Sequence, residues 1–425
     1  MTNKNLWRIS ALFTVLAALA LAFASCSSPL DTSLEEGHGQ SRSVGNTLPR
    51  QDIDIENSDD FEKFVARVLA TPGGNVSAVL LNDVDLTGVA FAPIGVDPTT
   101  GNVVTAYTGD FDGDGYTLSG INITRGNNFV GLFAINNGTI HDLRVTGSVT
   151  ANYSGPADDI DYVGGVVAYN DINGHIENVV SEVSVGFTGD DDAADHIHNI
   201  GGIAGFNGWD SYNAGSPHYG QTYQPGGDIF QCRNEGSVSG GFNKVGGIVG
   251  ENAYNVKECS NYGEITVTKT TTGWIGAGGI VGRNGNNNTA TEYGTILNCY
   301  NRAQIYDKAS MSTGHDAYGG ITGWCNNLSY VANCYDTGDF DPGIGQKNPI
   351  IGRVDTSQGK GINNYSLDTV FASSTDVVLT GIRRTEAQMK APSFVTELDL
   401  DGVYTAVTGE YPILTWELAN PPPLR

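Results

Sequence analysis

The chain has 425 residues, of which 39% are apolar and only 16% are charged, so it can bury a large core. Its formal net charge of −25 argues against nucleic acid as a partner, because binding to phosphates requires clustered Lys and Arg. The 57 glycines do not follow the strict triplet of collagen, and they indicate many tight corners instead.

Residues 1–25 are predicted to be a secretory signal peptide. Lys4 and Arg8 precede an apolar run from Leu12 to Ala24, which is too short to span a bilayer. The small residues directly before Cys26 resemble a bacterial lipoprotein processing site, at which the cysteine becomes the lipidated N-terminus. We therefore predict an exported protein held at the outer membrane or cell surface by a lipid on Cys26. Simple secretion and an uncleaved anchor are the alternatives.

Two short regions follow the predicted lipidation site. Residues 26–50 are rich in Ser, Gly, Glu and Asp without periodicity, which predicts a flexible tether. Residues 51–74 contain one amphipathic helix that begins near Ser58. We expect this helix to cap the open end of the repeats, which would otherwise expose apolar side chains and strand edges. One face of the helix carries Phe61, Phe64, Val65, Val68 and Leu69.

Residues 75–370 form a series of repeats. Val245-Gly-Gly-Ile-Val-Gly-Glu-Asn is followed by Glu258-Cys-Ser-Asn-Tyr-Gly-Glu-Ile, and similar pairs of motifs begin at Ala277 and Tyr318. With three looser copies included, the repeats start at residues 130, 163, 200, 245, 277 and 318, which gives intervals of 33, 37, 45, 32 and 41 residues. Periods in this range are typical of stacked units that bury their apolar sides against their neighbours.

Within the repeats, short apolar runs predict β-strands. Glu182-Val-Ser-Val and Glu264-Ile-Thr-Val-Thr alternate polar and apolar residues, with Ile and Val inward and Ser and Thr outward. Gly and Asn corners separate these runs, and we also expect the first strands at Val76–Asp85 and Val103–Thr108. The pattern predicts an all-β parallel β-helix, or solenoid. A propeller or sandwich array is the alternative, but a propeller blade needs four antiparallel strands and each copy shows about three.

The repeats resemble the GLUG-motif repeat family of bacterial cell-surface proteins, in its lipoprotein form. Phe91-Ala-Pro-Ile-Gly, Phe111-Asp-Gly-Asp-Gly and Tyr411-Pro-Ile-Leu-Thr-Trp are similar to the lead-in and tail of that family. The resemblance covers about residues 75 to 417. It implies a role at the cell surface, where such repeats occur in adhesins and as accessory regions of large enzymes.

Residues 371–425 are predicted to form a C-terminal cap and tail. Thr385-Glu-Ala-Gln-Met-Lys indicates a short helix, and Tyr411 to Trp416 indicates a final apolar strand. The three prolines that begin at Pro421 cannot continue either element.

Four cysteines occupy equivalent places in successive repeats, while Cys325 stands apart. Their equivalence predicts a ladder of buried free thiols that pack as small apolar groups. One or more disulfides, or a metal site, are the alternatives. The four are Cys232, Cys259, Cys299 and Cys334.

Two acidic stretches are candidate metal sites. Asp110, Asp112 and Asp114 match the first half of a calcium loop, although Ile121 stands where such a loop has its bidentate acid. A corner that uses the intervening glycines is the alternative, and we predict no other cofactor. His196 and His198 follow several aspartates, which indicates either a metal site or an acidic loop with two surface imidazoles.

The longest repeat interval contains an aromatic-rich segment that we expect to leave the stack as a loop. Exposed aromatic rings suit protein or sugar contacts. A loop that folds back over the edge of the core is the alternative. The ligand-binding candidates in this segment are Trp209, Tyr212, Tyr219 and Tyr223.

The sequence lacks the motifs of the common hydrolases. His-Glu-x-x-His, Gly-x-Ser-x-Gly and a Walker loop are all absent. We therefore predict a non-enzymatic adhesion or binding scaffold, with a protein or glycan of a host or neighbouring cell as its partner. A polysaccharide lyase or hydrolase on a β-helix, and an envelope protein without its own ligand, are the alternatives.

Overall fold

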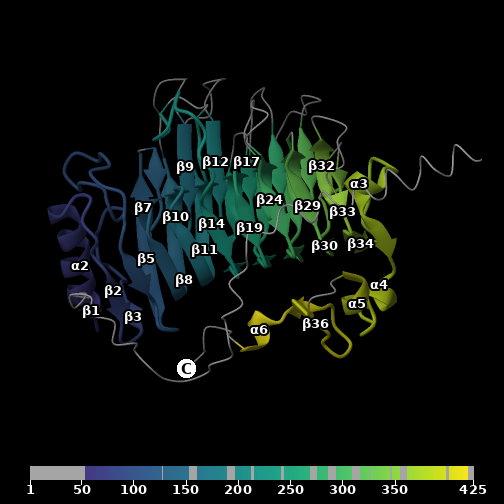
Figure 1. Ribbon diagram of the computed structural model, residues 1–425, viewed down its shortest axis with the longest axis horizontal. Coiled ribbons are helices and arrows are strands. Elements are labelled where there is room, and N and C mark those ends of the chain that lie inside the picture. Colours follow the sequence, from purple (N-terminus) through teal and green to yellow (C-terminus); the bar gives the residue numbers. More distant parts are fainter. Residues whose placement is uncertain are drawn as a thin grey trace, which may run out of the picture. The chain divides into compact units, whose positions relative to one another are not determined.

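Figure 1 shows the computed structural model of the chain. Gln51–Arg425 form one compact unit. The described residues are 53–419 except for 127, 153–159, 189–196, 212–214, 241–243, 269–274, 286–292, 309–315, 327, 345–346, 355–360 and 399–401. The predicted signal peptide, Cys26 and the tether lie outside them. No helix among the described residues is long and apolar enough to span a membrane.

Most described strands belong to three parallel sheets (Figure 1). A typical repeat contributes in turn β9 (Ile160–Gly164), β10 (Val167–Asn170) and the long β11 (His175–Phe187), one to each sheet. Each strand pairs in parallel with the equivalent strand of the next repeat, for example Val167 with Ala204. This solenoid-like arrangement is consistent with a β-helix. It does not fit the propeller alternative, whose blades are antiparallel.

Sheet 1 is the large sheet. It contains β1 (Ile53–Ile55), β2 (Ala78–Leu80), β3 (Val84–Asp85), β4 (Asp110–Asp112), β5 (Thr117–Arg125), β8 (Thr139–Ala151), β11, β14 (Asp228–Phe230), β15 (Arg233–Asn234), β16 (Val238–Gly240), β19 (Asn255–Lys257), β20 (Ser260–Asn261), β21 (Ile265–Val267), β24 (Thr295–Leu297), β25 (Tyr300–Asn301), β26 (Ile305–Asp307), β29 (Tyr330–Ala332), β30 (Tyr335–Asp336), β33 (Gly361–Ile362), β34 (Tyr365–Leu367) and β35 (Ile382–Arg384).

The other two parallel sheets are smaller. Sheet 2 contains β6 (Phe129–Val130), β9, β12 (Ile197–Gly201), β17 (Lys244–Gly246), β22 (Gly276–Gly278), β27 (Ala317–Gly319) and β31 (Lys347–Asn348). Sheet 3 contains β7 (Phe133–Asn136), β10, β13 (Ala204–Asn207), β18 (Val249–Asn252), β23 (Val281–Asn284), β28 (Thr322–Cys325) and β32 (Ile351–Val354).

The glycines of the repeat motif let sheets 2 and 3 approach closely. A methyl group on Gly201 of β12 would lie 2.1 Å from the Ala204 carbonyl oxygen and 2.7 Å from that of Ile248. A methyl group on Gly250 of β18 would lie 2.4 Å from the Ile200 nitrogen. Any side chain at either position would therefore collide with backbone, which explains why the motif requires glycine there.

The asparagines of the motif form two ladders that join consecutive coils. In the first ladder each side-chain Nδ2 donates to the next Oδ1 at 2.8–2.9 Å. The same amides also bond to backbone groups at the corners, so the corners keep their buried polar groups satisfied. The first ladder contains Asn136, Asn170, Asn207, Asn252 and Asn284, and the second contains Asn234, Asn261, Asn301 and Asp336.

The predicted thiol ladder is confirmed. The Cys259 amide donates to Cys299 Sγ at 3.4 Å, and the Cys299 amide donates to Cys334 Sγ at 3.3 Å. All five cysteines among the described residues, including Cys232 and Cys325, are free and buried in the core. The strands predicted around residues 182–185 and 264–268 are also present, within β11 and as β21.

The predicted helix at the start of the unit is α2 (Ser58–Ala70). Asn57 caps it, since its Oδ1 accepts the Asp60 amide at 3.2 Å. Phe64 packs its ring 5.4 Å from that of Phe111 in the first coils, and Phe61, Val65 and Val68 are also buried. The helix therefore continues the apolar core beyond the first strands.

The strand expected at residues 103–108 is absent, although β2 and β3 lie within the region expected for the first strands. Val103 makes only an isolated antiparallel bridge to Val96. The chain turns between these two residues, where the Asp97 carboxylate accepts the Thr99 amide at 2.8 Å. Tyr107 makes a further isolated parallel bridge to Asn136, so this region pairs with its neighbours at single residues and not as a continuous strand.

The C-terminal segment first ends the stack and then packs along sheet 1 (Figure 1). Its strand β35 pairs with β34, and the expected helix near residue 385 is present as α4. The strand expected at residues 411–416 is only β37 (Ile413–Leu414), in an antiparallel pair with β36 (Tyr404–Thr405), because Trp416 begins a helix. The helices after the stack are α3 (Val377–Thr380), α4 (Glu386–Met389), α5 (Phe394–Leu398) and α6 (Trp416–Ala419).

Candidate functional site

The candidate site lies on the outer face of sheet 1, where β4 meets β8. The parallel register places Asp110 opposite Thr139 and Asp112 opposite His141. Paired strands lie about 4.8 Å apart, so side chains that share a face on adjacent coils can touch. Residues distant in the sequence thus become neighbours on this face.

A local bend in β8 turns two consecutive side chains outward. Asp142 has a positive φ of 52°, which breaks the strict alternation of the strand. Ile140 and Leu143 are buried on either side of it, while His141 and Asp142 are both partly exposed. The same bend recurs in the following coils, for example at Asn178. The bend is therefore a property of the repeat, and the first bend differs from the others only in the side chains that it carries.

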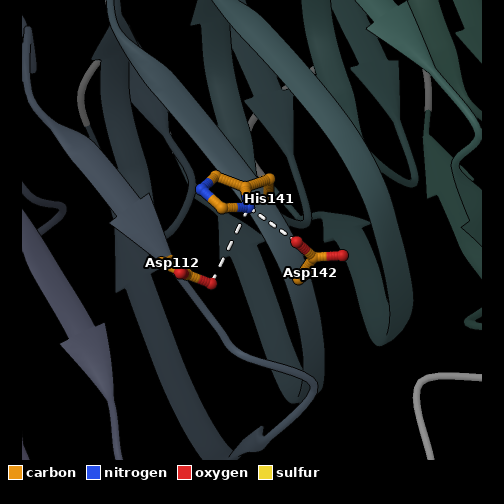
Figure 2. A group of neighbouring side chains, drawn as sticks. All are labelled: Asp112, His141 and Asp142. Atoms are coloured by element: carbon orange, nitrogen blue, oxygen red, sulfur yellow. Dashed lines mark hydrogen bonds and ion pairs between the residues drawn. The ribbon is translucent and has the colours of Figure 1, made fainter. Parts of the chain in front are cut away.

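His141 lies at the centre of a group of carboxylates. Its Nδ1 is 2.7 Å from Asp142 Oδ2 and 3.7 Å from Asp112 Oδ1 (Figure 2). Its Nε2 is 3.1 Å from Asp110 Oδ1. Both ring nitrogens therefore face anionic oxygens.

These contacts shift the ionisation of the group. The hydrogen bond to Asp142, together with the charges of Asp112 and Asp110, raises the pKa of His141 to about 9 despite partial burial. The same hydrogen bond from His141, helped by Asn178, lowers the pKa of Asp142. Desolvation instead raises the pKa of Asp112. At neutral pH the cluster therefore holds an imidazolium among carboxylates.

Neighbouring groups fix the two carboxylates that flank Nδ1. The Asp114 amide donates to Asp112 Oδ1 at 2.7 Å, and the Asn178 side chain on the next coil donates to Asp142 Oδ1. The carboxylates are thus positioned before any ligand arrives. Chemically, the cluster offers one imidazole nitrogen and two carboxylate oxygens on a partly exposed face.

The three aspartates predicted as calcium ligands do not come together as one three-donor group. Among the described residues, the group with donor atoms within 4.8 Å of one another contains Asp112, His141 and Asp142. Asp110 contacts the other side of the imidazole, and Asp114 contributes its backbone amide. His141 cannot be recognised from the sequence alone, because its partnership with Asp112 depends on the register between two coils.

The expectation of two surface imidazoles after the acidic stretch is wrong for His198, and His196 lies outside the described residues. His198 is completely buried in β12, and its Nδ1 lies 2.9 Å from Asp161 Oδ2. Its ring centroid is 4.2 Å from that of Phe187. The residue lies on a strand instead of a loop, so it is packed inside the unit.

Of the aromatic candidates that the structure describes, one is exposed as expected and the other two are partly or wholly buried. Trp209 is only 6% exposed and stacks on His218 with ring centroids 3.6 Å apart. Tyr223 is partly buried and donates its hydroxyl to the Ala253 carbonyl at 3.3 Å. Tyr219 is 59% exposed, and Tyr212 lies outside the described residues. Trp209 therefore serves packing, in line with the alternative of a segment that folds back.

A second group of charges is buried between sheets 2 and 3. Lys244 Nζ lies 2.8 Å from Glu251 Oε2, and Arg283 Nη1 lies 3.7 Å from Glu251 Oε1. Burial lowers the pKa of Lys244, while the Glu251 charge opposes this shift. Arg283 also lies over the Trp324 ring at 5.6 Å. Because Lys244, Glu251 and Arg283 are all buried, this charged group stabilises the stack and is not open to ligands.

Comparison with known proteins gives a structural similarity. No family model and no curated protein matches it. Among solved structures, it is similar to the crystal structure of a putative immunoglobulin A1 protease from Bacteroides ovatus. That similarity has a TM-score of 0.49 and 18% sequence identity, over 88% of this chain and 94% of that one. The membership in the GLUG-motif repeat family stays a prediction.

Proposed function

We propose that the protein is an exported surface lipoprotein that acts as a binding scaffold for adhesion. The supporting observation is a row of polar side chains in one register position on the outer face of sheet 1. Five consecutive coils contribute to this polar row, and each of its side chains is partly exposed. The polar row consists of Asp110, Thr139, His175, Asp228 and Asn255.

A row of this kind suits an extended, hydroxyl-rich ligand such as a glycan chain. Its hydrogen-bonding groups repeat about every 4.8 Å along the stack, so a polymer laid across the coils meets a group at each step. The buried asparagine ladders hold the coils rigidly, and rigidity limits the entropy that binding costs. Within the polar row, the Asn255 amide already donates to Asp228 Oδ1 at 2.8 Å, which fixes both side chains.

The C-terminal segment covers a neighbouring strip of sheet 1, formed by β20, β25 and the corner before β20. Glu417 accepts a hydrogen bond from the Ser260 hydroxyl at 2.6 Å, and Arg302 donates to the Pro412 carbonyl at 2.8 Å. Trp416 Nε1 donates to the Glu258 carbonyl at 3.0 Å. The polar row lies on β4, β8, β11, β14 and β19, beside this covered strip, and we therefore assign ligand binding to the polar row.

The proposed scaffold also includes closure of each coil into a parallel β-helix. One continuous apolar cluster contains residues from all three sheets, among them Val145, Val163 and Val167. Burial of one shared core by three sheets favours a closed cross-section. An experimental structure with open, unconnected sheets would contradict this part of the proposal.

Binding is tested with a glycan and host-matrix array probed with residues 27–425. The double variant Asp228→Ala/Asn255→Ala should lose at least tenfold in affinity for any ligand found, with an unchanged melting temperature. Tyr219→Ala is the matched control on the aromatic segment and should bind normally. If Tyr219→Ala abolishes binding and the double variant does not, the ligand contacts that segment and not the polar row.

A parallel screen separates the scaffold from the enzyme alternative. Acidic and neutral polysaccharides are incubated with the protein, and new reducing ends and unsaturated products are measured. The scaffold proposal predicts no turnover of a polysaccharide that binds. Cleavage that disappears in His141→Ala would contradict it and favour a lyase or hydrolase.

The anchor is tested separately. The unmodified protein should incorporate radiolabelled palmitate, and Cys26→Ser should abolish the label and release the protein from membranes once the signal is cut elsewhere. Absence of label in the unmodified protein would contradict lipidation without affecting the binding proposal.

A further inference from the structure

We propose that Asp112, His141 and Asp142 bind one divalent transition-metal ion of the zinc class, and that Asp110 orients the imidazole. This inference is independent of the proposed scaffold function. The calcium hypothesis drawn from the sequence does not include His141, the central ligand of this site, because His141 lies on the next coil.

The spacing of the donor atoms matches a small ion with tetrahedral coordination. Zinc binds nitrogen and carboxylate oxygen at about 2.0–2.2 Å, so two of its ligands lie roughly 3.3 Å apart. In the structure, the distances from His141 Nδ1 to the oxygens of Asp142 and Asp112 are 2.7 and 3.7 Å, on either side of that value. The three donor atoms lie within 4.8 Å of one another, so side-chain rotations would place them around one ion (Figure 2).

Asp110 supplies a second and separate feature of metal sites. A histidine that binds a metal through one ring nitrogen commonly donates the other N–H to a carboxylate, which fixes the tautomer and the ring orientation. Asp110 Oδ1 lies 3.1 Å from His141 Nε2, on the side of the ring away from the three-donor group. With Nε2–H donated to Asp110, the lone pair of Nδ1 points toward Asp112 and Asp142.

Charge also favours a cation at this position. Asp110, Asp112 and Asp142 bring three carboxylates around one imidazole, and a positive charge among them lowers their mutual repulsion. A divalent ion would supply that charge. The three side chains are partly exposed, so an ion has access from solvent and can keep a water as its fourth ligand.

The kind of metal follows from the donor set. Calcium takes six to eight oxygen ligands, whereas this site offers two carboxylates and an imidazole nitrogen. Imidazole suits zinc, copper, nickel and iron, and mixed nitrogen and oxygen donors favour these over magnesium or calcium. We therefore use Zn²⁺ and its spectroscopic substitute Co²⁺ as probes.

The test uses residues 27–425 without a histidine tag, stripped with chelator. Equilibrium dialysis and calorimetry with Zn²⁺ should find one ion per chain. Co²⁺ should give the visible absorption of a four-coordinate site, and Zn²⁺ should displace it. His141→Ala and Asp142→Asn should each weaken binding by at least 100-fold, and Asp110→Asn by about 10- to 100-fold, the range expected for an outer-shell partner.

His175→Ala is the matched control. His175 lies on the same sheet face one coil further on, and its Nε2 is 2.9 Å from Glu177 Oε2. His175 has one carboxylate partner where His141 has three, so the His175→Ala variant should bind Zn²⁺ at His141 as the unmodified protein does. Circular dichroism must show that every variant remains folded.

Three results would overturn the proposal. The first is no uptake of Zn²⁺ or Co²⁺ at micromolar concentration. The second is equal uptake by folded His141→Ala, which would place the ion elsewhere. The third is tight binding of Ca²⁺ with no binding of Zn²⁺, which would support the oxygen ligands of Asp110, Asp112 and Asp114 instead.

Discussion

At the scale of single residues, the setting of a side chain decides its chemistry. His141 and His198 both lie on parallel strands. His141 is partly exposed among three carboxylates, whereas His198 is buried against Phe187. Asp142 follows His141 directly in the chain, but the other charged partners of the two histidines lie on strands that the register places alongside.

The ionisation of His141 gives the first prediction. In metal-free protein its pKa should be about 9, where an unperturbed histidine has 6.5, because carboxylates stabilise the imidazolium. Since the folded pKa lies above the unfolded one, this stabilisation is complete below pH 6.5 and is lost as the pH rises through 9. It amounts to at most about 3 kcal/mol. Proton NMR of the imidazole measures the pKa.

Denaturant unfolding at pH 6 and pH 9.5 provides the check on stability. The unmodified protein should lose more free energy of unfolding between these two values than His141→Gln does. An imidazole that titrates near 6.5, or equal pH dependence in both proteins, would show that the carboxylates do not act on it in this way.

Glu251 is the subject of the second prediction. Glu251→Ala should destabilise the protein by about 3–5 kcal/mol, because Lys244 and Arg283 would stay buried without their counter-charge. Chemical denaturation followed by circular dichroism measures the change. Glu62→Ala on the exposed side of α2 is the control and should alter stability by less than about 0.5 kcal/mol. Equal effects of the two substitutions would mean that the ion pairs are not buried as described.

At the scale of elements, the repeats are held by side-chain ladders as well as by strand pairing. The asparagine ladders connect one corner to the next with hydrogen bonds between buried amides. The thiol ladder fills the core between the same coils. Each element thus depends on its two neighbours, as in other stacked repeats.

The asparagine ladder gives the third prediction. Asn252 donates to Asn284 Oδ1 at 2.9 Å and accepts from Asn207 Nδ2 at 2.8 Å. Asn252→Ala would leave both partners and the corner backbone short of hydrogen bonds, at a cost of about 2–4 kcal/mol. The exposed Asn122→Ala is the control and should be close to neutral. Thermal unfolding compares the two, and a small shift for Asn252→Ala would indicate that water replaces the lost amide.

At the scale of the whole unit, hydrogen bonds join the C-terminal segment to residues far away in the sequence. The carboxylate of Glu417 accepts hydrogen bonds from the hydroxyls of Ser260 and Tyr300, both at 2.6 Å. Tyr404 donates to the Asn333 carbonyl at 2.9 Å. The C-terminal segment is therefore tied to the outer face of sheet 1 along several coils.

The fourth prediction concerns this attachment. Glu417→Ala should loosen residues 402–418, because the two hydroxyls and the Leu414 amide lose their acceptor. Hydrogen exchange in this segment should accelerate at least tenfold while the coils keep their protection. Glu410→Ala on the exposed turn of the same segment is the control and should exchange as the unmodified protein does. Faster exchange throughout the unit would mean that the segment supports the stack itself.

The sequence alone determined the repeating plan. Helix α2, the alternating runs within β11 and β21 and the buried thiols follow from periodicity, because apolar spacing reports directly on which side of an element is buried. The glycine pairs and the corner asparagines were visible for the same reason, since each recurs at an equivalent place in most copies.

Only the tertiary structure decided which side chains meet. Asp112 and His141 become partners through the register of β4 with β8, and a shift of one residue would turn His141 inward. Trp209 is buried because His218 folds back onto it. In each case the energy comes from contacts between chain segments that no local pattern encodes, so neither His141 as the central ligand nor the stacking of His218 on Trp209 could be derived from the sequence.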